Sequence, residues 1–234
     1  MAFRKLTALS LTDLFVNEIE KMILSGELKI GEKMPPERQL AEEMKVSLAV
    51  INAGITRLTS LGFLRVVPRK GVYVADYIRD GNMNTMKEVI EFTGIKPDDN
   101  VLEPIARFRL SIELGATKEA CLKRTDDSLI TLQNIINQIE TDRSCDLAEL
   151  GFQFHHEVAI CSGNIYYPML VQTYEPLYTL FYRMSLDSEK KETILKCLKD
   201  ILEAIKRQDT EMAENVIEAA IERWMESLGK TLKK

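Results

Sequence analysis

Two groups of residues in this sequence have the types and spacing to bind an anionic molecule. The first lies within residues 34–77, where an amide side chain and several cations stand among short apolar repeats. The second begins with Arg109, whose planar guanidinium matches the two oxygens of a carboxylate or phosphate. Catalytic groups are scarce, because the 234 residues include two histidines and no nucleophile elbow, P-loop or glycine-rich dinucleotide turn. These features favour a binding protein over an enzyme.

Two short helices are predicted to position the first group. A proline stands where the first helix starts, Glu37–Met44, and its missing N–H costs nothing in a first turn. After the turn Lys45-Val46, Ser47 can cap a second helix by accepting a hydrogen bond from a backbone N–H. That helix is expected to end at Gly62, a residue suited to left-handed backbone, and its apolar positions follow helical spacing: Val50, Ile51, Ile55, Leu58 and Leu61.

Two helices joined by a tight turn are typical of a helix-turn-helix, whose second helix enters the major groove by its N-terminal end. Ser47, Leu48, Ala49 and Asn52 stand at that end and are candidates for phosphate or base-edge contacts. Asn52 is the best candidate for reading a base, because an amide can pair with a base edge. Ser47 could instead be a plain N-cap, which is compatible with a DNA contact, and Asn52 could be an ordinary solvated residue.

Strand-favouring residues predict a hairpin after the second helix. Residues 63–67 and 72–74 flank the turn Pro68-Arg69-Lys70-Gly71. Arg69 and Lys70 would contact phosphates or the minor groove, a contribution that falls with salt, although a basic hairpin tip can also be merely solvated. A helix-turn-helix followed by a two-stranded wing predicts a winged helix that binds double-stranded DNA.

This segment resembles the DNA-binding domain of the GntR superfamily of bacterial transcription regulators. The resemblance implies that Arg38 contacts the DNA backbone or bases, together with the start of the second helix and the wing that carries Gly71. The family usually has Ser-Arg-x-Thr-Val-Arg-Glu-Ala where this chain has Ser47 to Gly54, so both arginines and the glutamate are absent. An arginine paired with guanine contributes about 1–3 kcal/mol of discrimination, so the family's usual operator is not expected. The matching residues are Glu37-Arg38-Gln39-Leu40-Ala41, Val46-Ser47, Arg57-Leu58, Leu61-Gly62 and Gly71-Val72-Tyr73-Val74.

Beyond about Met83 the sequence shows helical periodicity and no convincing strands. The expected fold is mainly α: a winged helix-turn-helix over 1–78 and an antiparallel all-α bundle of six or seven helices over 79–234. Residues 1–78 carry a net charge of +2 and the remainder −7. The predicted helices span 83–93, 100–122, 126–141, 146–162, 166–186, 190–207 and 210–229.

Neither a signal peptide nor a membrane span is predicted, because no window approaches 18 uncharged apolar residues. The four cysteines are scattered without CxxC spacing, which is typical of reduced thiols. A cytoplasmic protein is therefore expected.

The bundle resembles the ligand-binding, dimer-forming domain of the FadR-type (FCD) branch of the same superfamily. The resemblance implies a homodimer on a palindromic operator and a small carboxylate or acyl-CoA-like effector. The effector contacts expected here are Arg109, His155, Asn164 and Tyr178. The matching residues are Arg107 and Arg109 with Glu113, Phe154-His155, Ser162-Gly163-Asn164, and Leu202-Glu203-Ala204-Ile205 leading to Asp209.

Many members of that branch hold a divalent metal with one acidic or amide residue and three histidines. Those positions fall on Gly151, His155, Leu198 and Ala220, so one of the four ligands remains. Because metal sites need three or four donors, neither a metal nor another cofactor is expected.

Several alternatives stay open for the effector residues. Arg109 could form an ion pair with Glu113 at i+4 instead of binding a ligand, and His155 could be a hydrogen-bonded core residue. Aromatic residues between 152 and 182 could line an acyl cavity or form the core: Phe152, Tyr166, Tyr167, Tyr174, Tyr178, Phe181 and Tyr182. The expected function is a DNA-binding transcriptional regulator that responds to a small anion. The alternative is a constitutive dimeric repressor without an effector.

Overall fold

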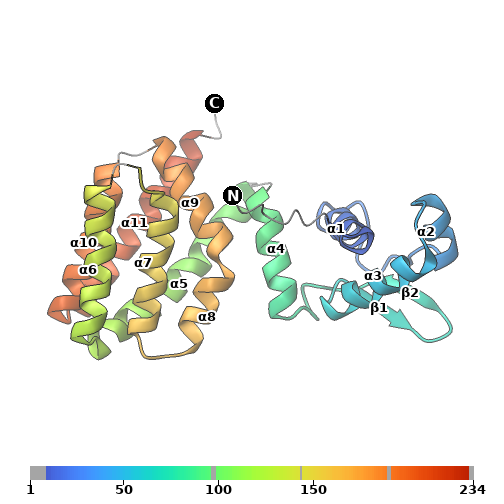
Figure 1. The fold of residues 1–234 in the computed structure, drawn as a ribbon, viewed down its shortest axis with the longest axis horizontal. Helices are drawn as coiled ribbons and strands as arrows, with labels where there is room; N and C mark the ends of the chain where they lie inside the picture. The colour runs from blue at the N-terminus through green and yellow to red at the C-terminus, as the bar shows by residue number, and fades with distance from the viewer. Residues whose placement is uncertain (1–8, 96–98, 143, 189–190, 232–234) are drawn as a thin grey trace, which may run out of the picture. The chain divides into compact units, whose positions relative to one another are not determined.

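The computed structural model describes residues 9–95, 99–142, 144–188 and 191–231 (Figure 1). The chain forms two compact units, Met1–Phe92 and Thr93–Lys234. Helix α4 (Met83–Ile95) begins in the first unit, where the Thr85 hydroxyl donates a 2.7 Å hydrogen bond to the Leu61 carbonyl. The boundary predicted from the sequence, between residues 78 and 79, lies just ahead of this helix.

The first unit is a winged helix-turn-helix, as predicted. Helices α2 and α3 are joined by a turn in which Lys45 adopts a positive φ of 54°. The Ser47 hydroxyl caps α3 by accepting a 3.3 Å hydrogen bond from the Val50 N–H. Besides α4, the elements of this unit are α1 (Leu11–Leu24), α2 (Glu37–Glu43), α3 (Leu48–Ser60), β1 (Leu64–Val67) and β2 (Gly71–Val74).

Helix α1 was not among the predicted elements. Ser10 and Asp13 form a capping box at its start, each side chain bonding the other's backbone N–H. The helix packs against α3 and contributes four large apolar side chains to the core of the unit: Phe15, Val16, Ile19 and Ile23.

The end of α3 is fixed by the glycine that the sequence marks for this purpose. Gly62 has a φ of +81°, and the Gly62 N–H donates to the Thr59 carbonyl while the Phe63 N–H donates to the Leu58 carbonyl at 2.9 Å. These two bonds form a Schellman motif, which satisfies carbonyls left free at the helix end. The chain is thereby turned directly into β1.

The wing is an antiparallel hairpin of β1 and β2 in which Leu64 pairs with Val74 and Val67 pairs with Gly71. Residues 31–34 run along the other edge of β2, where the Met34 N–H donates to the Val72 carbonyl at 2.9 Å. The hairpin is therefore supported on both sides of β2, and its turn projects the predicted basic tip.

Gly54 lies in the middle of α3 because the helix passes very close to α1. It is buried, and a Cβ at this position would lie 2.2 Å from Cδ1 of the Phe15 ring. Glycine costs about 1 kcal/mol relative to alanine inside a helix. Here the absence of a side chain allows the two helices to pack closely.

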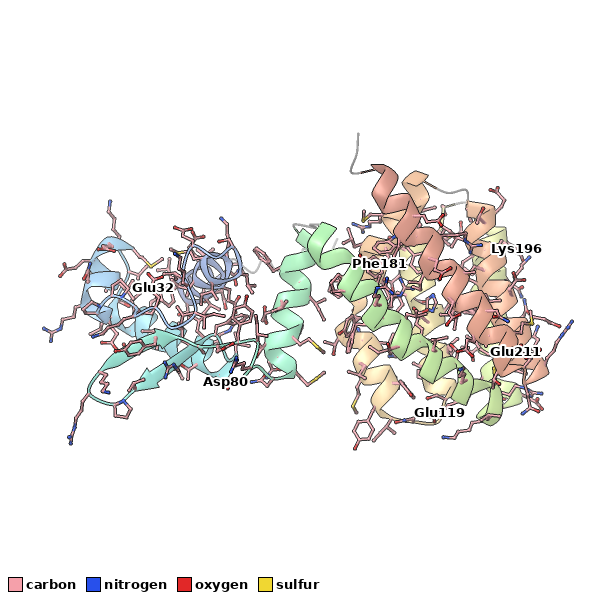
Figure 2. The ribbon with its side chains drawn as sticks, turned by 180° about the vertical axis from the view of Figure 1, so that it is seen from behind. Glu32, Asp80, Glu119, Phe181, Lys196 and Glu211 are labelled. Carbon is pink, nitrogen blue, oxygen red and sulfur yellow. The ribbon has the colours of Figure 1, made fainter. Side chains whose placement is uncertain are left out.

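Seven helices, α5 to α11, form the second unit within the described residues, whereas the helix predicted over 83–93 corresponds to α4, which lies mostly in the first unit. Helix α5 packs against α7, α10 and α11, and α7 also packs against α6, α8 and α9. Phe181 points into this bundle, whereas Lys196 and Glu211 lie exposed on it (Figure 2). The helices are α5 (Asp99–Lys123), α6 (Asp126–Thr141), α7 (Leu147–Cys161), α8 (Tyr166–Thr173), α9 (Glu175–Ser188), α10 (Lys191–Arg207) and α11 (Thr210–Thr231).

The single helix predicted over 166–186 is wrong, because the structure has two helices there. Helix α8 ends at Thr173 and α9 begins at Glu175. Pro176 follows at once, and proline lacks the N–H that a continuous helix would require. The break lets the two segments take separate positions beside α7.

Replacing Gly54 with alanine is expected to destabilise the first unit by about 1–3 kcal/mol, because the added methyl overpacks the contact with Phe15. Native-state hydrogen exchange of α1 and α3 amides measures this loss, and amides of the second unit serve as the internal control. Adding Phe15→Leu should recover part of it. A stabilised Gly54→Ala protein would show that helix propensity outweighs the contact.

Glu20 on α1 gives the first unit a pH-dependent stability. The side chain is 8% exposed, and among the described residues its Oε1 atom has no hydrogen-bond partner. Burial and the nearby Glu88 carboxylate raise the pKa of Glu20 to about 7, against the opposing charge of Arg57. Because the folded protein holds this proton where the unfolded chain has lost it, stability falls as the pH rises from about 4.5 to about 7.

Glu20→Gln is therefore expected to reduce this pH dependence. Hydrogen exchange in α1 and α3, corrected for its intrinsic pH dependence, should show wild-type protection lower at about pH 8 than at about pH 5.5, with a smaller difference in the variant. An equal difference in both proteins would show that Glu20 does not cause it.

Candidate functional site

The residues predicted to contact DNA are all exposed on the first unit. They come from three places in the fold, namely α2, the start of α3 and the tip of the wing. They are Arg38 on α2, Ser47, Leu48, Ala49 and Asn52 at the start of α3, and Arg69, Lys70 and Gly71 in the wing. This placement is the one that groove binding by a winged helix requires.

The start of α3 presents an apolar and an amide side chain to solvent. Leu48 is 41% exposed, although it is a large hydrophobic residue. Within the part of the chain that the structure describes, the Asn52 amide makes no hydrogen bond, while the Asn52 carbonyl accepts one of 2.9 Å from the Thr56 hydroxyl. Asn52 is therefore available to a binding partner.

Arg57, the cation on α3, is held by α1. Its Nη1 atom lies 2.6 Å from Oδ1 of Asp13, the residue that also closes the capping box with Ser10. Hydrogen bonds from Ser10 and the Arg57 guanidinium lower the pKa of Asp13. Arg57, part of the motif that carries the family resemblance, thus has a visible role in joining α3 to α1.

Two exposed cations were not singled out from the sequence. Lys45 lies in the turn directly ahead of α3, and Arg65 lies on β1 with its guanidinium carbon 5.5 Å from the centre of the Tyr73 ring. Both belong to the elements that carry the predicted contacts. In the sequence, the position of Lys45 in the turn and that of Arg65 in the wing are the features that could have indicated a DNA contact.

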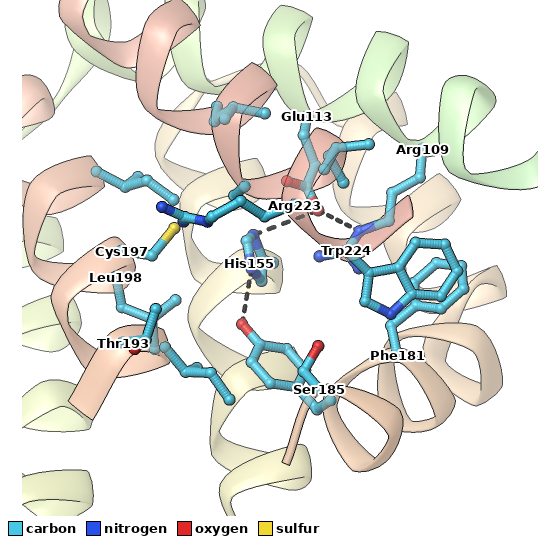
Figure 3. A pocket seen from close by; sticks show the side chains of 16 residues that line it. Arg109, Glu113, His155, Phe181, Ser185, Thr193, Cys197, Leu198, Arg223 and Trp224 are labelled. Carbon is cyan, nitrogen blue, oxygen red and sulfur yellow. Dashed lines mark hydrogen bonds and ion pairs between the residues drawn. The ribbon is translucent and has the colours of Figure 1, made fainter. Parts of the chain in front are cut away.

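A cavity of about 70 Å³ lies inside the second unit (Figure 3). Its wall includes Arg109 and Glu113 from α5, His155 from α7, Tyr182 from α9, and Arg223 from α11. Apolar side chains of α10 and α11 complete it, together with Trp224: Ile194, Leu198, Ile201, Ile217 and Ile221. The structure therefore brings two of the four predicted effector residues, Arg109 and His155, to one cavity.

Arg109 and Glu113 form a buried ion pair, one of the two alternatives that the sequence left open. The Arg109 Nε atom lies 2.6 Å from Glu113 Oε1, and the side chains are 10% and 6% exposed. Burial opposes the charge on Glu113, but the adjacent Arg109 guanidinium outweighs it and lowers the pKa of Glu113. The guanidinium carbon also lies 4.1 Å from the centre of the Tyr178 ring and 5.1 Å from that of Phe181.

His155 is a neutral residue held between two partners. Its Nε2 atom lies 2.9 Å from the Tyr182 hydroxyl and its Nδ1 atom 3.5 Å from Glu113 Oε1. Burial lowers the pKa of His155 to about 4, despite the Glu113 carboxylate. A carboxylate can only accept, so a proton on Nδ1 faces Glu113 and Nε2 accepts the Tyr182 hydroxyl proton.

The other two predicted effector residues do not line the cavity. Tyr178 is 1% exposed and lies behind Arg109, against whose guanidinium it stacks. Asn164 lies in the turn between α7 and α8, where its Oδ1 atom accepts a 3.2 Å hydrogen bond from the Tyr166 N–H. Asn164 thus has a local role at the start of a helix, which accounts for it without a ligand.

The positions aligned with metal ligands do not form a metal site. His155, Leu198 and Ala220 all line the cavity, but two of them carry no donor. At the fourth position, a Cβ on Gly151 would lie 2.3 Å from the Tyr182 ring, so that ring occupies the space an acidic side chain would need. Within the described residues, no group of three or more histidine, cysteine or acidic side chains could hold a metal ion.

Arg223 is a further cavity residue that the sequence reasoning missed. It is exposed, and none of the ion pairs among the described residues involves it. It also borders a groove between α10 and α11 that shares Thr193 and Cys197 with the cavity. A helical pattern alone does not show that this arginine lies at a cavity.

No helix in the described parts of the chain is long and apolar enough to cross a membrane.

Comparisons with known proteins identify both units. Residues 13–74 match the family described as bacterial regulatory proteins, gntR family, and residues 104–223 match the FCD domain. The HTH-type transcriptional regulator YcbG of Bacillus subtilis (strain 168) is 25% identical over 198 residues, covering 83% of this chain and 79% of the relative. The fatty acid metabolism regulator protein of Shewanella halifaxensis (strain HAW-EB4) is 22% identical over 178 residues, covering 75% and 72%.

Among solved structures, a similar fold occurs in a protein described as "Lar controls the expression of the Listeria monocytogenes agr system and mediates virulence". It is 18% identical, with a TM-score of 0.58 over 96% of this chain and 99% of the other. The winged helix, the helical unit and both family matches agree. The chain belongs to the GntR family of bacterial regulatory proteins and is a DNA-binding transcriptional regulator with an FCD domain.

Proposed function

We propose that this regulator binds a specific operator as a homodimer and that a small organic acid in the cavity of the second unit modulates its affinity for DNA. The observation that carries the proposal is the cavity beside Arg109 and Arg223, which lies in a unit joined to an exposed DNA-binding surface. Two copies would place two winged helices on the half-sites of a palindrome, about one DNA turn apart.

The modest charge of the DNA-binding region supports a dimer. Residues 1–78 have a net charge of +2, which gives a single copy little electrostatic affinity for DNA. Two linked copies bind together with much higher affinity. An effector that favours one dimer geometry would then strengthen or weaken DNA binding through its differential affinity for the two geometries.

The size of the cavity favours a small acid over an acyl thioester. About 70 Å³ has room for roughly five water-sized groups. Of the aromatic residues that could have enclosed an acyl chain, Phe181 and Tyr182 line the cavity, whereas Tyr174 and Tyr178 lie outside its wall and are 3% exposed or less. A short carboxylate fits this space without moving a helix.

The balance of charges in the cavity favours Arg223 as the residue that binds the carboxylate of the effector. The charge of Arg109 is already balanced by Glu113, whereas Arg223 stands at the cavity without a carboxylate partner among the described residues. The neutral pair of His155 and Tyr182 adds polar atoms without adding charge. The cavity therefore offers one uncompensated guanidinium, which suits an anion.

Arg38→Ala is expected to weaken binding to all DNA sequences and to lower the slope of log affinity against log salt by about one, because a phosphate contact is lost. Fluorescence anisotropy with operator and unrelated duplexes at several salt concentrations measures both effects. Arg207→Ala is the control, since it removes an equal charge from the second unit, where Arg207 pairs with Glu203. An unchanged salt slope in Arg38→Ala would remove Arg38 from the interface.

Arg223→Gln is expected to weaken carboxylate binding about tenfold or more, because a charged hydrogen bond contributes about 1.5–3 kcal/mol. Trp224 is the single tryptophan of the chain and lines the cavity, so its fluorescence reports binding of acetate, pyruvate, malonate or succinate. Parallel anisotropy titrations follow the DNA affinity. A chelator should change neither signal, because the site needs no metal.

Lys196→Gln is the matched control for that experiment, because Lys196 lies in the neighbouring groove and outside the cavity. An equal loss in both variants would show that overall charge, and not Arg223, attracts the ligand. If no carboxylate alters tryptophan fluorescence or DNA affinity, the helical unit serves dimerisation alone and the regulator is constitutive.

A further inference from the structure

The outward face of α3 has an unusual chemical character for a helix that enters DNA. Its first two turns expose Leu48, Ala49, Asn52 and Ala53, while Ile51, Gly54 and Ile55 face the core. Since residues three and four apart share a helix face, the exposed set forms one continuous surface. The surface consists of a branched apolar side chain, two methyl groups and a primary amide.

This surface contains no cation that is free to read guanine. Arg57 is the cation of α3, and its guanidinium is engaged 2.6 Å from Asp13. Asp13 is itself fixed by Ser10 at the start of α1, so the ion pair is part of the packing between two helices. Lys45 stands outside the helix, ahead of the Ser47 cap, in a position suited to the phosphate backbone.

The major-groove edges of the bases show which pair fits such a surface. Adenine offers an acceptor at N7 and a donor at N6, which match the two ends of an asparagine amide, and thymine offers a C5 methyl group for apolar contact. Guanine presents two acceptors, O6 and N7, so the Asn52 carbonyl would face an acceptor. A G·C pair also lacks the methyl group against which Leu48 could be buried.

We infer that α3 selects A·T base pairs, with Asn52 pairing with an adenine and with Leu48 and Ala49 contacting thymine methyl groups. The inference rests on the proposed function in one respect, that this surface enters the major groove of a specific operator. Arg38, Arg69 and Lys70 then supply phosphate contacts that hold the helix in register. In this inference, the missing family arginines change the base that α3 recognises, and the helix still reads a sequence.

The first experiment selects binding sites for the full-length protein from a random double-stranded library. The enriched half-site is expected to contain adjacent A·T pairs where α3 contacts the groove, and changing one of them to G·C should weaken binding about fivefold to 150-fold. Enriched G·C pairs at these positions would overturn the inference. If DNA binds without sequence preference, the inference falls while DNA binding stands, and if no DNA binds at all, the proposed function falls as well.

Base analogues then test each contact. Replacing thymine with deoxyuridine removes only the methyl group, and it should weaken wild-type binding about fourfold at the position beside Leu48. Replacing adenine with 7-deazaadenine removes the N7 acceptor and should weaken binding at the position of Asn52. Each loss should vanish in one variant: the deoxyuridine effect in Leu48→Ala, and the deazaadenine effect in Asn52→Ala.

Thr59→Ala is the matched control, because Thr59 is exposed in the last turn of α3 and outside this surface. It should keep both analogue effects at their wild-type size. Both losses persisting in Leu48→Ala and Asn52→Ala would overturn the inference, because the analogues would then act through DNA shape. The slope against salt should stay unchanged in Leu48→Ala and Asn52→Ala, since neither side chain carries charge.

Discussion

The buried ion pair between Arg109 and Glu113 is the interaction around which the second unit is built. Charges removed from water are costly unless they are paired, and losing one partner of a buried pair costs about 3–5 kcal/mol. The Tyr178 and Phe181 rings cover the guanidinium, and His155 stays neutral beside the carboxylate. The fold therefore uses the positive charge of Arg109 for its own stability. In the proposed effector site, Arg223 is therefore the cation that remains for a ligand.

The same separation of roles occurs in the first unit. Arg57 is used to attach α3 to α1 through Asp13, and Gly54 lets the two helices approach closely enough for the Phe15 ring to pack against the helix. The opposite face of α3 is left to uncharged side chains. Positive charge for DNA remains at the edges, on α2 and on the wing. In the proposed mode of binding, different elements of one small domain therefore supply affinity and sequence reading.

Tyr182 explains how the cavity can exist without the metal that many members of the branch hold. With glycine at position 151, the tyrosine ring lies where an acidic ligand would project, and its hydroxyl bonds the Nε2 atom of His155. The lone pair that a metal would need is therefore engaged by a hydrogen bond. Gly151 and Tyr182 lie far apart in the sequence, and the absence of a side chain at Gly151 leaves room for the Tyr182 ring.

Most of the secondary structure and the family resemblance could be predicted from the sequence, because caps, apolar periodicity and glycine positions act through neighbouring residues. Ser47 and Gly62 bound α3 as predicted, and the wing follows from strand-favouring runs around a turn. The break at Glu175 was missed, although Pro176 signals it locally. Helix α1 was not assigned, despite its capping box.

Contacts between side chains of different helices were established only by the tertiary structure. It placed Arg223 at the cavity, brought Tyr182 to His155 and joined Arg57 to Asp13. The last two contacts join residues that are 27 and 44 positions apart on separate helices, and a helical pattern does not say which helix lies opposite. The packing of the helices sets the neighbours of a side chain, whereas the local sequence sets only the helix face on which the side chain lies.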